Sequence, residues 1–283
     1  MPVGIVSEIA EVRSAVAQVR KIGSTVGLVP TMGALHAGHA SLIRTARAQT
    51  DFVAVSIYVN PSQFGPHEDF SRYPRTLESD QELCRSLGVD LIYTPETREI
   101  YPAGYASWVE VDKLSQHLCG ASRPGHFRGV ATIVLKLMNI VQPDVAFFGQ
   151  KDIQQAVIIR KVLGDLHVPT RIEILPTVRE SDGLAMSSRN RYLDPIQRRN
   201  ALVVHRSLQQ AYELFQAGER NAAVLMALVE REVLSTASAR LDYACVVDLE
   251  DLQPVALVAR PAVLAEAVYF GSTRLIDNII LTP

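Results

Sequence analysis

Two histidines stand three positions apart in residues 30–39, which read PTMGALHAGH. An apolar run at residues 25–29 precedes this segment and an apolar periodicity of helical type follows it, so the pattern predicts a strand-to-helix turn. Because positions i and i+3 share one face of a helix, His36 and His39 can face one ligand. Imidazole N–H groups and the unpaired amides of a helix N-terminus both donate to phosphate oxygens. The segment therefore indicates a site for the phosphate chain of a nucleotide.

The same residues have two plainer interpretations. Gly33 and Gly38 suit any tight turn, and the two histidines can be surface or capping residues, since short motifs often match by chance. A zinc site is the second alternative. Histidines at this spacing lack a third ligand at a recognisable distance, and the sequence contains no C-x-x-C pair.

Two other polar segments suit a nucleotide. Lys151 and Asp152 follow an apolar strand-like run that ends at Gly149, so the ammonium can meet phosphates while the carboxylate accepts hydrogen bonds from ribose hydroxyls. A surface ion pair explains the Lys-Asp pair equally simply. Residues 182–190 are small and polar, as in a mobile loop that closes two hydroxyls and an arginine over a triphosphate. The alternative is a polar loop before a helix.

The elements that must position these groups alternate along the chain. Strands are predicted at residues 25–29, 52–59, 90–93, 145–148 and 171–175, and helices at residues 38–48, 76–87, 130–141 and 152–163, besides an amphipathic helix in the first 20 residues. This rhythm predicts an α/β fold with a Rossmann-like parallel sheet covered on both faces, in which ligands bind beyond the carboxyl ends of the strands.

The pattern changes after residue 177. Helices are predicted at residues 195–217 and 220–235, and strands at residues 241–248, 263–270 and 275–281. This change of pattern, together with the family resemblance given below, predicts a catalytic domain over residues 1–176 and a smaller C-terminal α+β domain, acting as a lid, over residues 177–283.

Composition narrows the class of protein. The 28 basic and 30 acidic residues give a formal charge of −2, so no global positive field would attract nucleic acid, and we expect no nucleic-acid partner. The three cysteines are scattered, which favours reduced thiols and a cytoplasmic location. Lys136 interrupts the apolar run after Gly129, so we expect no membrane span.

The H-x-G-H element resembles the HIGH signature of the nucleotidylyltransferase superfamily, which also includes class I aminoacyl-tRNA synthetases. The full segment 30–39 is similar to the pantothenate synthetase family, and the similarity continues through six ordered blocks. These blocks are residues 59–64 (VNPSQF), 68–75 (EDFSRYPR), 123–127 (RPGHF), 148–155 (FGQKDIQQ), 182–190 (DGLAMSSRN) and 274–278 (RLIDN).

The resemblance implies a C–N ligase that condenses (R)-pantoate with β-alanine to give pantothenate. ATP would be the cosubstrate with Mg²⁺, a pantoyl adenylate the intermediate, and pyrophosphate and AMP the other products. Relatives in this family are homodimers, so a homodimer is expected. Two rivals stay open: a nucleotidyltransferase that stops at an activated nucleotide, and an ATP-sensing module without chemistry.

The resemblance also assigns residues. The catalytic group would be His36, His39, Lys151, Ser187 and Ser188. ATP would contact Met32, Gly33, Ala34, Leu35, His36, Ala37, Gly38, His39, Gly149, Gln150, Lys151, Asp152, Val178, Met186, Ser187, Ser188 and Arg189. The substrates would contact Met32, Asn60, Gln63, Tyr73, Arg123 and Gln155.

Magnesium is expected at Asp80. The family often has adjacent acids after the Y-P-R block, whereas this chain reads ESDQE at residues 78–82. Mg²⁺ needs one or two carboxylates besides phosphate oxygens and water. A solvated helix face explains these acids equally well.

Overall fold

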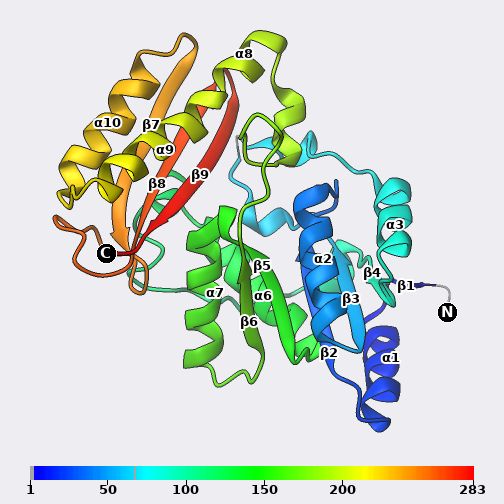
Figure 1. Cartoon of the computed structure of the whole chain (residues 1–283). Coiled ribbons are helices and arrows are strands. Elements are labelled where there is room, and N and C mark those ends of the chain that lie inside the picture. Colours follow the sequence, from blue (N-terminus) through cyan, green and yellow to red (C-terminus); the bar gives the residue numbers. More distant parts are fainter. Residues whose placement is uncertain (1–2, 67) are drawn as a thin grey trace. The chain divides into compact units, whose positions relative to one another are not determined.

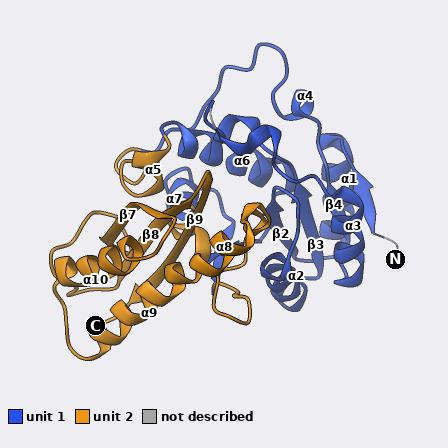
Figure 2. Ribbon diagram, turned by 90° about the horizontal axis from the view of Figure 1, so that it is seen from above, with its two compact units in different colours: residues 1–111, 124–149, 158–176 blue, residues 112–123, 150–157, 177–283 orange. Residues whose placement is uncertain are grey.

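The computed structural model describes residues 3–66 and 68–283, and the chain divides into two compact units (Figures 1 and 2). Unit 1 comprises residues 1–111, 124–149 and 158–176, and unit 2 comprises residues 112–123, 150–157 and 177–283. Unit 2 includes residues 177–283, the range expected for the second domain, and two earlier segments of the chain. That residues 177–283 act as a lid domain stays a prediction.

Within the described residues, unit 1 contains one sheet of six strands in the order β1-β4-β3-β2-β5-β6, and every neighbouring pair is parallel. The strands are β1 (Gly4–Val6), β2 (Val26–Thr31), β3 (Phe52–Ile57), β4 (Leu91–Tyr93), β5 (Val145–Gly149) and β6 (Arg171–Leu175). The chain moves from β2 through β3 to β4 and then returns to pair β5 with the other side of β2. The predicted Rossmann-like parallel sheet is confirmed, and its switch point lies between β2 and β5.

Helices cover both faces of this sheet (Figure 1). They are α1 (Ile9–Lys21), α2 (Ala37–Gln49), α3 (Leu77–Ser86), the single turn α4 (Thr97–Ile100), α6 (His126–Val141) and α7 (Ile153–Asp165), which links β5 to β6. Apolar residues of α2 and α3 pack with strand residues such as Val29, Val55 and Phe147 in one buried core. Helices α1 and α6 pack against each other on the opposite face. No helix in the described ranges is long and apolar enough to cross a bilayer.

Three details of unit 1 differ from the sequence expectations. The edge strand β1 was not predicted, because three residues are too few to show a period. Strand β3 ends at Ile57 and not at residue 59, since a turn of 3₁₀ helix forms at Pro61–Gln63. Helix α6 begins at His126, four residues early, because Gly125 takes a left-handed conformation (φ 80°) and provides the turn into the helix.

Unit 2 contains three antiparallel strands in its described part, in the order β7-β8-β9: β7 (Ala239–Asp248), β8 (Ala262–Phe270) and β9 (Thr273–Leu281). Helices α9 (Leu202–Gln216) and α10 (Ala222–Leu234) pack against this sheet around a core that includes Leu208, Phe215 and Val268. The smaller α+β fold is therefore confirmed.

The helix predicted at residues 195–217 is two helices. Asp194 caps α8 (Pro195–Asn200) through N–H groups of Ile196 and Gln197, with Pro195 in the first position where proline is favoured. The helix closes at Ala201 before α9 begins. The short single-turn helix α5 (Cys119–Ser122), also in unit 2, was not predicted.

A buried carboxyl group lies inside unit 2. Glu266 on β8 is 0% exposed and stands directly opposite Asp277 of β9 in the strand register. Burial raises the pKa of Glu266 well above its usual value, although the Ser207 hydroxyl donates to its Oε1 at 2.9 Å. The charged form loses its hydration there without gaining a cation, so burial favours the protonated form of Glu266.

We expect Glu266→Gln to change the pH dependence of stability. The folded pKa lies above the ordinary value of 4.5, so the wild-type folding equilibrium loses roughly tenfold per pH unit as pH rises above that value, until the folded pKa is reached. Glutamine mimics the protonated acid and removes this loss. Urea unfolding from pH 4.5 to 8 should therefore show a stability advantage of the variant that grows with pH. A pH-independent difference between the two proteins would contradict a raised pKa of Glu266.

Candidate active site

The turn after β2 is held by Asp80. Gly33 and Ala34 both have positive φ angles (83° and 51°), and the backbone N–H groups of Ala34 and Leu35 donate to the Asp80 carboxylate at 2.9 and 2.8 Å. The Thr76 hydroxyl also donates to it, at 3.1 Å. The carboxylate is 2% exposed, so the solvated-helix interpretation is wrong for this residue. Two amides expected near ATP therefore face Asp80.

The two histidines cap helix α2 and contact each other. His36 Nδ1 accepts the Gly38 N–H at 3.1 Å, His39 Nδ1 accepts the His36 N–H at 3.3 Å, and the ring centroids are 4.2 Å apart. Since each Nδ1 is an acceptor, the proton of each neutral ring lies on Nε2. A Cβ atom at Gly38 would come within 2.8 Å of the His36 ring, so a larger residue at this position would displace that ring. The arrangement offers two Nε2–H donors at one helix N-terminus.

Beside this turn, three of the expected substrate residues form one hydrogen-bonded cluster. Gln63 Nε2 donates to Met32 Sδ at 3.1 Å, and Asn60 Nδ2 donates to Gln63 Oε1 at 3.0 Å. Asn60 also donates to the Gly129 carbonyl at 3.2 Å. Asn60 and Gln63 are buried, so their amides are fixed in orientation. Asn60 uses both N–H hydrogens of its amide inside the cluster, so it orients Gln63, whose amide is of the type that both donates and accepts.

A second layer braces the cluster. Tyr101 and Ser62 donate to Asn60 Oδ1, each at 2.9 Å, and His126 Nδ1 contacts the Gln63 carbonyl oxygen at 2.8 Å. Burial raises the pKa of Tyr101 to about 12, so its hydroxyl stays protonated and can donate. His126 thus braces the Gln63 backbone. Tyr73, another expected substrate residue, is buried with its ring edge-on to Phe64.

Lys151 lies on a turn of 3₁₀ helix (Gln150–Asp152) in unit 2, immediately before α7. Gln154 and Gln155 follow. Gln154 is buried and braces the segment before α5, accepting the Cys119 N–H at 3.0 Å and donating to the carbonyls of Leu114 and His117. Gln155 is half-buried, as is Arg123, also in unit 2. The bracing role of Gln154 was not predicted from the sequence.

The loop expected to close over phosphates is a small hairpin within unit 2. Arg179 and Ala185 form an antiparallel bridge, and the Met186 N–H donates to the Val178 carbonyl at 2.9 Å. Ser187 caps the following 3₁₀ turn (Ser188–Tyr192) by accepting the Arg189 N–H at 3.3 Å. The structure thus brings Val178 and residues 186–189 together.

The expected site residues therefore form two sets. Unit 1 holds residues 32–39, Asn60, Gln63, Tyr73, Asp80 and Gly149, and unit 2 holds Arg123, Gln150, Lys151, Asp152, Gln155, Val178 and residues 186–189. Contact of any of them with ATP or a substrate stays a prediction. Among the described residues no group of three His, Cys, Asp or Glu side chains could hold a metal ion. Burial raises the pKa of the Cys84 thiol to about 12, which makes Cys84 unreactive.

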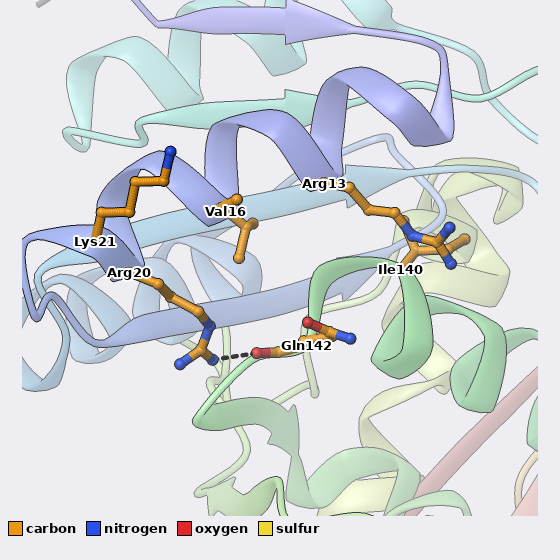
Figure 3. A pocket seen from close by; sticks show the side chains of 7 residues that line it. Arg13, Val16, Arg20, Lys21, Ile140 and Gln142 are labelled. Atoms are coloured by element: carbon orange, nitrogen blue, oxygen red, sulfur yellow. Dashed lines mark hydrogen bonds between the residues drawn. The ribbon is translucent and has the colours of Figure 1, made fainter.

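A pocket of about 520 Å³ lies elsewhere in unit 1 (Figure 3). It is lined by Arg13, Val16, Ala17, Arg20, Lys21, Ile140 and Gln142. Arg20 is already engaged by the Gln142 carbonyl and by Asp144 at 3.3 Å. Arg20, Lys21 and Ile140 lie in the last turns of helices α1 and α6, which precede the amino ends of β2 and β5. The pocket therefore lies near the amino ends of β2 and β5, whereas the H-x-G-H turn follows the carboxyl end of β2.

The parallel sheet with a switch point beside β2 places this chain among the α/β proteins that bind ligands beyond the carboxyl ends of their strands. Comparisons with known proteins narrow this class. The sequence model of the family described as pantoate-beta-alanine ligase matches residues 4–280. The chain belongs to the pantoate–β-alanine ligase family.

Individual proteins similar to this chain carry names of the same family. The chain is 55% identical over 277 residues to a pantothenate synthetase from Moorella thermoacetica, covering 98% of both chains. The crystal structure of pantothenate synthetase from Thermus thermophilus matches with a TM-score of 0.94 and 43% identity, over 99% of this chain and 100% of that one. A Francisella tularensis pantoate-beta-alanine ligase, solved with beta-gamma ATP and β-alanine, matches with a TM-score of 0.79 and 34% identity, over 98% and 97% of the two chains.

Proposed function

We propose that this protein condenses (R)-pantoate with β-alanine at the expense of ATP, giving pantothenate, AMP and pyrophosphate. The observation that carries this proposal is the paired Nε2–H donors of His36 and His39 at the N-terminus of α2, in a chain of the pantoate–β-alanine ligase family. Donors fixed in this way favour negative charge that develops on phosphate oxygens.

The first step forms pantoyl adenylate. A pantoate carboxylate oxygen attacks the α-phosphorus of ATP, and the bond from the α-phosphorus to the bridging oxygen of the leaving pyrophosphate breaks. Charge builds on the equatorial oxygens and on the leaving group. His36, His39, Lys151, Ser187 and Ser188 would donate to these oxygens and stabilise the transition state electrostatically.

The second step forms the amide. The β-alanine amine attacks the activated carbonyl carbon, AMP leaves with the oxygen that joined it to the acyl group, and the amine loses a proton. The Met32–Asn60–Gln63 cluster supports recognition of pantoate through Gln63, because Asn60 holds this amide in an orientation that can match hydroxyls or a carboxylate. Gln155, Arg123 and Tyr73 complete the proposed substrate set on the strength of the family motifs alone.

ATP is proposed to contact residues of both units. Met32–His39 and Gly149 would contribute from unit 1, and Gln150–Asp152, Val178 and Met186–Arg189 from unit 2. Closure of the residues from 177 onward would exclude water from the acyl adenylate, which hydrolyses when exposed.

Magnesium is proposed to accompany ATP and to shield the phosphate charges. Asp80, the carboxylate expected to hold it, is buried and both of its oxygens already accept hydrogen bonds from the turn. Asp80 therefore fits a turn-holding role better than a ligand role. Triphosphate oxygens and water would provide most of the coordination, as Mg²⁺ commonly prefers.

We expect Asp80→Asn to lower the adenylation rate by roughly tenfold, since a displaced turn misaligns both histidines. The concentration of Mg²⁺ that gives half-maximal activity should stay unchanged. Glu78→Gln, an exposed acid on the same helix, is the matched control and should behave as wild type. Recovery of Asp80→Asn at high Mg²⁺ would instead make Asp80 a magnesium ligand.

A homodimer and a cytoplasmic location are also proposed, the first from the family and the second from the three scattered cysteines, none of which forms a disulfide. Light scattering of the purified protein at several concentrations tests the dimer. A concentration-independent monomer mass would contradict it.

The reaction is tested by following pyrophosphate and AMP separately. With ATP and pantoate, one equivalent of pyrophosphate per active site should appear in a burst, and AMP should follow only when β-alanine is added. Continuous pyrophosphate release with a stable nucleotide product would favour a nucleotidyltransferase. ATP binding without either product would favour a sensing module.

A further inference from the structure

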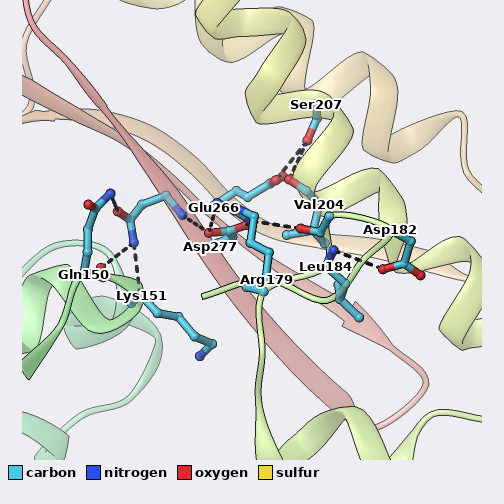
Figure 4. A network of polar contacts seen from close by, with 12 residues as sticks. Gln150, Lys151, Arg179, Asp182, Leu184, Val204, Ser207, Glu266 and Asp277 are labelled. Carbon is cyan, nitrogen blue, oxygen red and sulfur yellow. Dashed lines mark hydrogen bonds and ion pairs between the residues drawn. The ribbon is translucent and has the colours of Figure 1, made fainter. Parts of the chain in front are cut away.

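The block RLIDN at residues 274–278 has no role in the reaction described above. Its last two residues, Asp277 and Asn278, lie on the edge strand β9, and each is 2% exposed. Neighbouring side chains of a strand point to opposite faces, so the two can serve different segments. Figure 4 shows the polar network in which they take part.

Asn278 holds the backbone of the Lys151 turn. Its Nδ2 donates to the carbonyl oxygens of Gln150 and Lys151 at 2.9 and 3.0 Å, and its Oδ1 accepts from Gln150 Nε2 at 3.3 Å. The Lys151 side chain extends away from these contacts (Figure 4). The Asn278 carboxamide therefore fixes the backbone of Lys151, while the lysine side chain can still turn its ammonium toward a ligand.

Asp277 holds the hairpin that leads to Ser187. Both of its oxygens accept from the Arg179 guanidinium, at 2.5 and 3.2 Å, and Arg179 Nη1 also donates to the Gly183 carbonyl at 3.1 Å. Arg179 is bridged to Ala185 within the same hairpin. A bidentate pair of this kind restricts orientation as well as distance.

The charge pattern around Asp277 supports this role. Glu266 faces it across the strand register, and burial raises the pKa of Glu266, which favours the neutral acid beside Asp277. Asn278 adds a backbone N–H to Asp277 Oδ1 at 2.8 Å. The negative charge of Asp277 is therefore compensated by Arg179 and by this amide, both of which are tied to segments that carry proposed ATP contacts.

We propose that Asp277 and Asn278 are positioning residues that set the Lys151 turn and the hairpin before Ser187 and Ser188 in one fixed geometry for the triphosphate. The inference rests on the proposed function, because fixing the Lys151 turn and the hairpin affects the reaction only if Lys151 and the serines contact ATP. Neither residue needs to touch the nucleotide.

A double-mutant cycle tests the Asn278 arm. Asn278→Ala should lower the adenylation rate by roughly tenfold, the scale on which a misplaced catalytic group loses rate. In the Lys151→Ala background the same substitution should change the rate less than about twofold, since residues that act through one another are not additive. Asn200→Ala removes a comparable amide, bonded at 2.8 Å to the Ala237 carbonyl elsewhere in unit 2, and should leave the rate unchanged. If Asn278→Ala does not fold, Asn278→Ser, which keeps one donor, replaces it.

The Asp277 arm is tested by hydrogen exchange. Asp277→Asn should accelerate amide exchange across residues 179–189 and lower adenylation, without changing the melting temperature more than Asp242→Asn does. Asp242 pairs with Arg274 at 2.8 Å in the same sheet and is the matched control. Independent, multiplicative losses in the cycle, or normal adenylation by both folded variants, would overturn the proposal. Normal adenylation by Lys151→Ala alone would refute the proposed site, and the inference with it.

Discussion

His39→Ala is expected to lower the rate of adenylation by roughly 10²–10³, the loss seen when one preorganised transition-state donor is removed. The reason is the Nε2–H donor, whose position is set because Nδ1 accepts the His36 N–H. His36→Ala should show a loss of similar or smaller size. Single-turnover release of pyrophosphate from ATP and pantoate measures the step directly.

A helix cap is lost in the same variant, so a control must separate the two effects. His39 is the third residue of α2, where glutamine also closes a capping box. His39→Gln should therefore recover the melting temperature of the wild type but not its adenylation rate. If His39→Gln restored the rate as well, the histidine would act only through the cap.

Lys151→Ala is expected to lower adenylation by about 10², because an ammonium directed at phosphate oxygens stabilises charge that grows in the transition state. The KM for pantoate should change little. Lys161→Ala is the matched control, since Lys161 lies on the adjoining helix α7 and only pairs with Asp165 on the surface, at 2.6 Å. Equal losses in the two variants would indicate a general effect of charge and would remove Lys151 from the site.

Much of the fold was predictable because its signals are local. Buried parallel strands such as β2 and β5 appear as short apolar runs, and α2 appears as a helical period after a glycine-rich turn. The break at Ala201 and the strand β1 were missed for the opposite reason. The break at Ala201 ends a helix without glycine or proline. Strand β1 depends on pairing with β4, in which Gly4 faces Leu91, 87 residues later in the chain.

The site was predictable as a set of residues but not as a set of contacts. Asp80 was placed in an acidic stretch, yet its carboxylate faces the amides of Ala34 and Leu35, which lie 45 or more residues earlier. No local pattern indicates that orientation. The same holds for Asn278, which bonds Lys151 across 127 residues. Spacing along the sequence can identify polar groups, whereas their partners depend on how the strands and helices pack.

In the proposed reaction, a pantoate carboxylate oxygen attacks the α-phosphorus of ATP. The most direct measurement uses pantoate labelled with ¹⁸O in the carboxylate, together with ATP and β-alanine, and analyses the products by mass spectrometry. AMP should carry one labelled oxygen, and pyrophosphate should carry none. Label in inorganic phosphate with ADP as coproduct, or AMP without label, would contradict it.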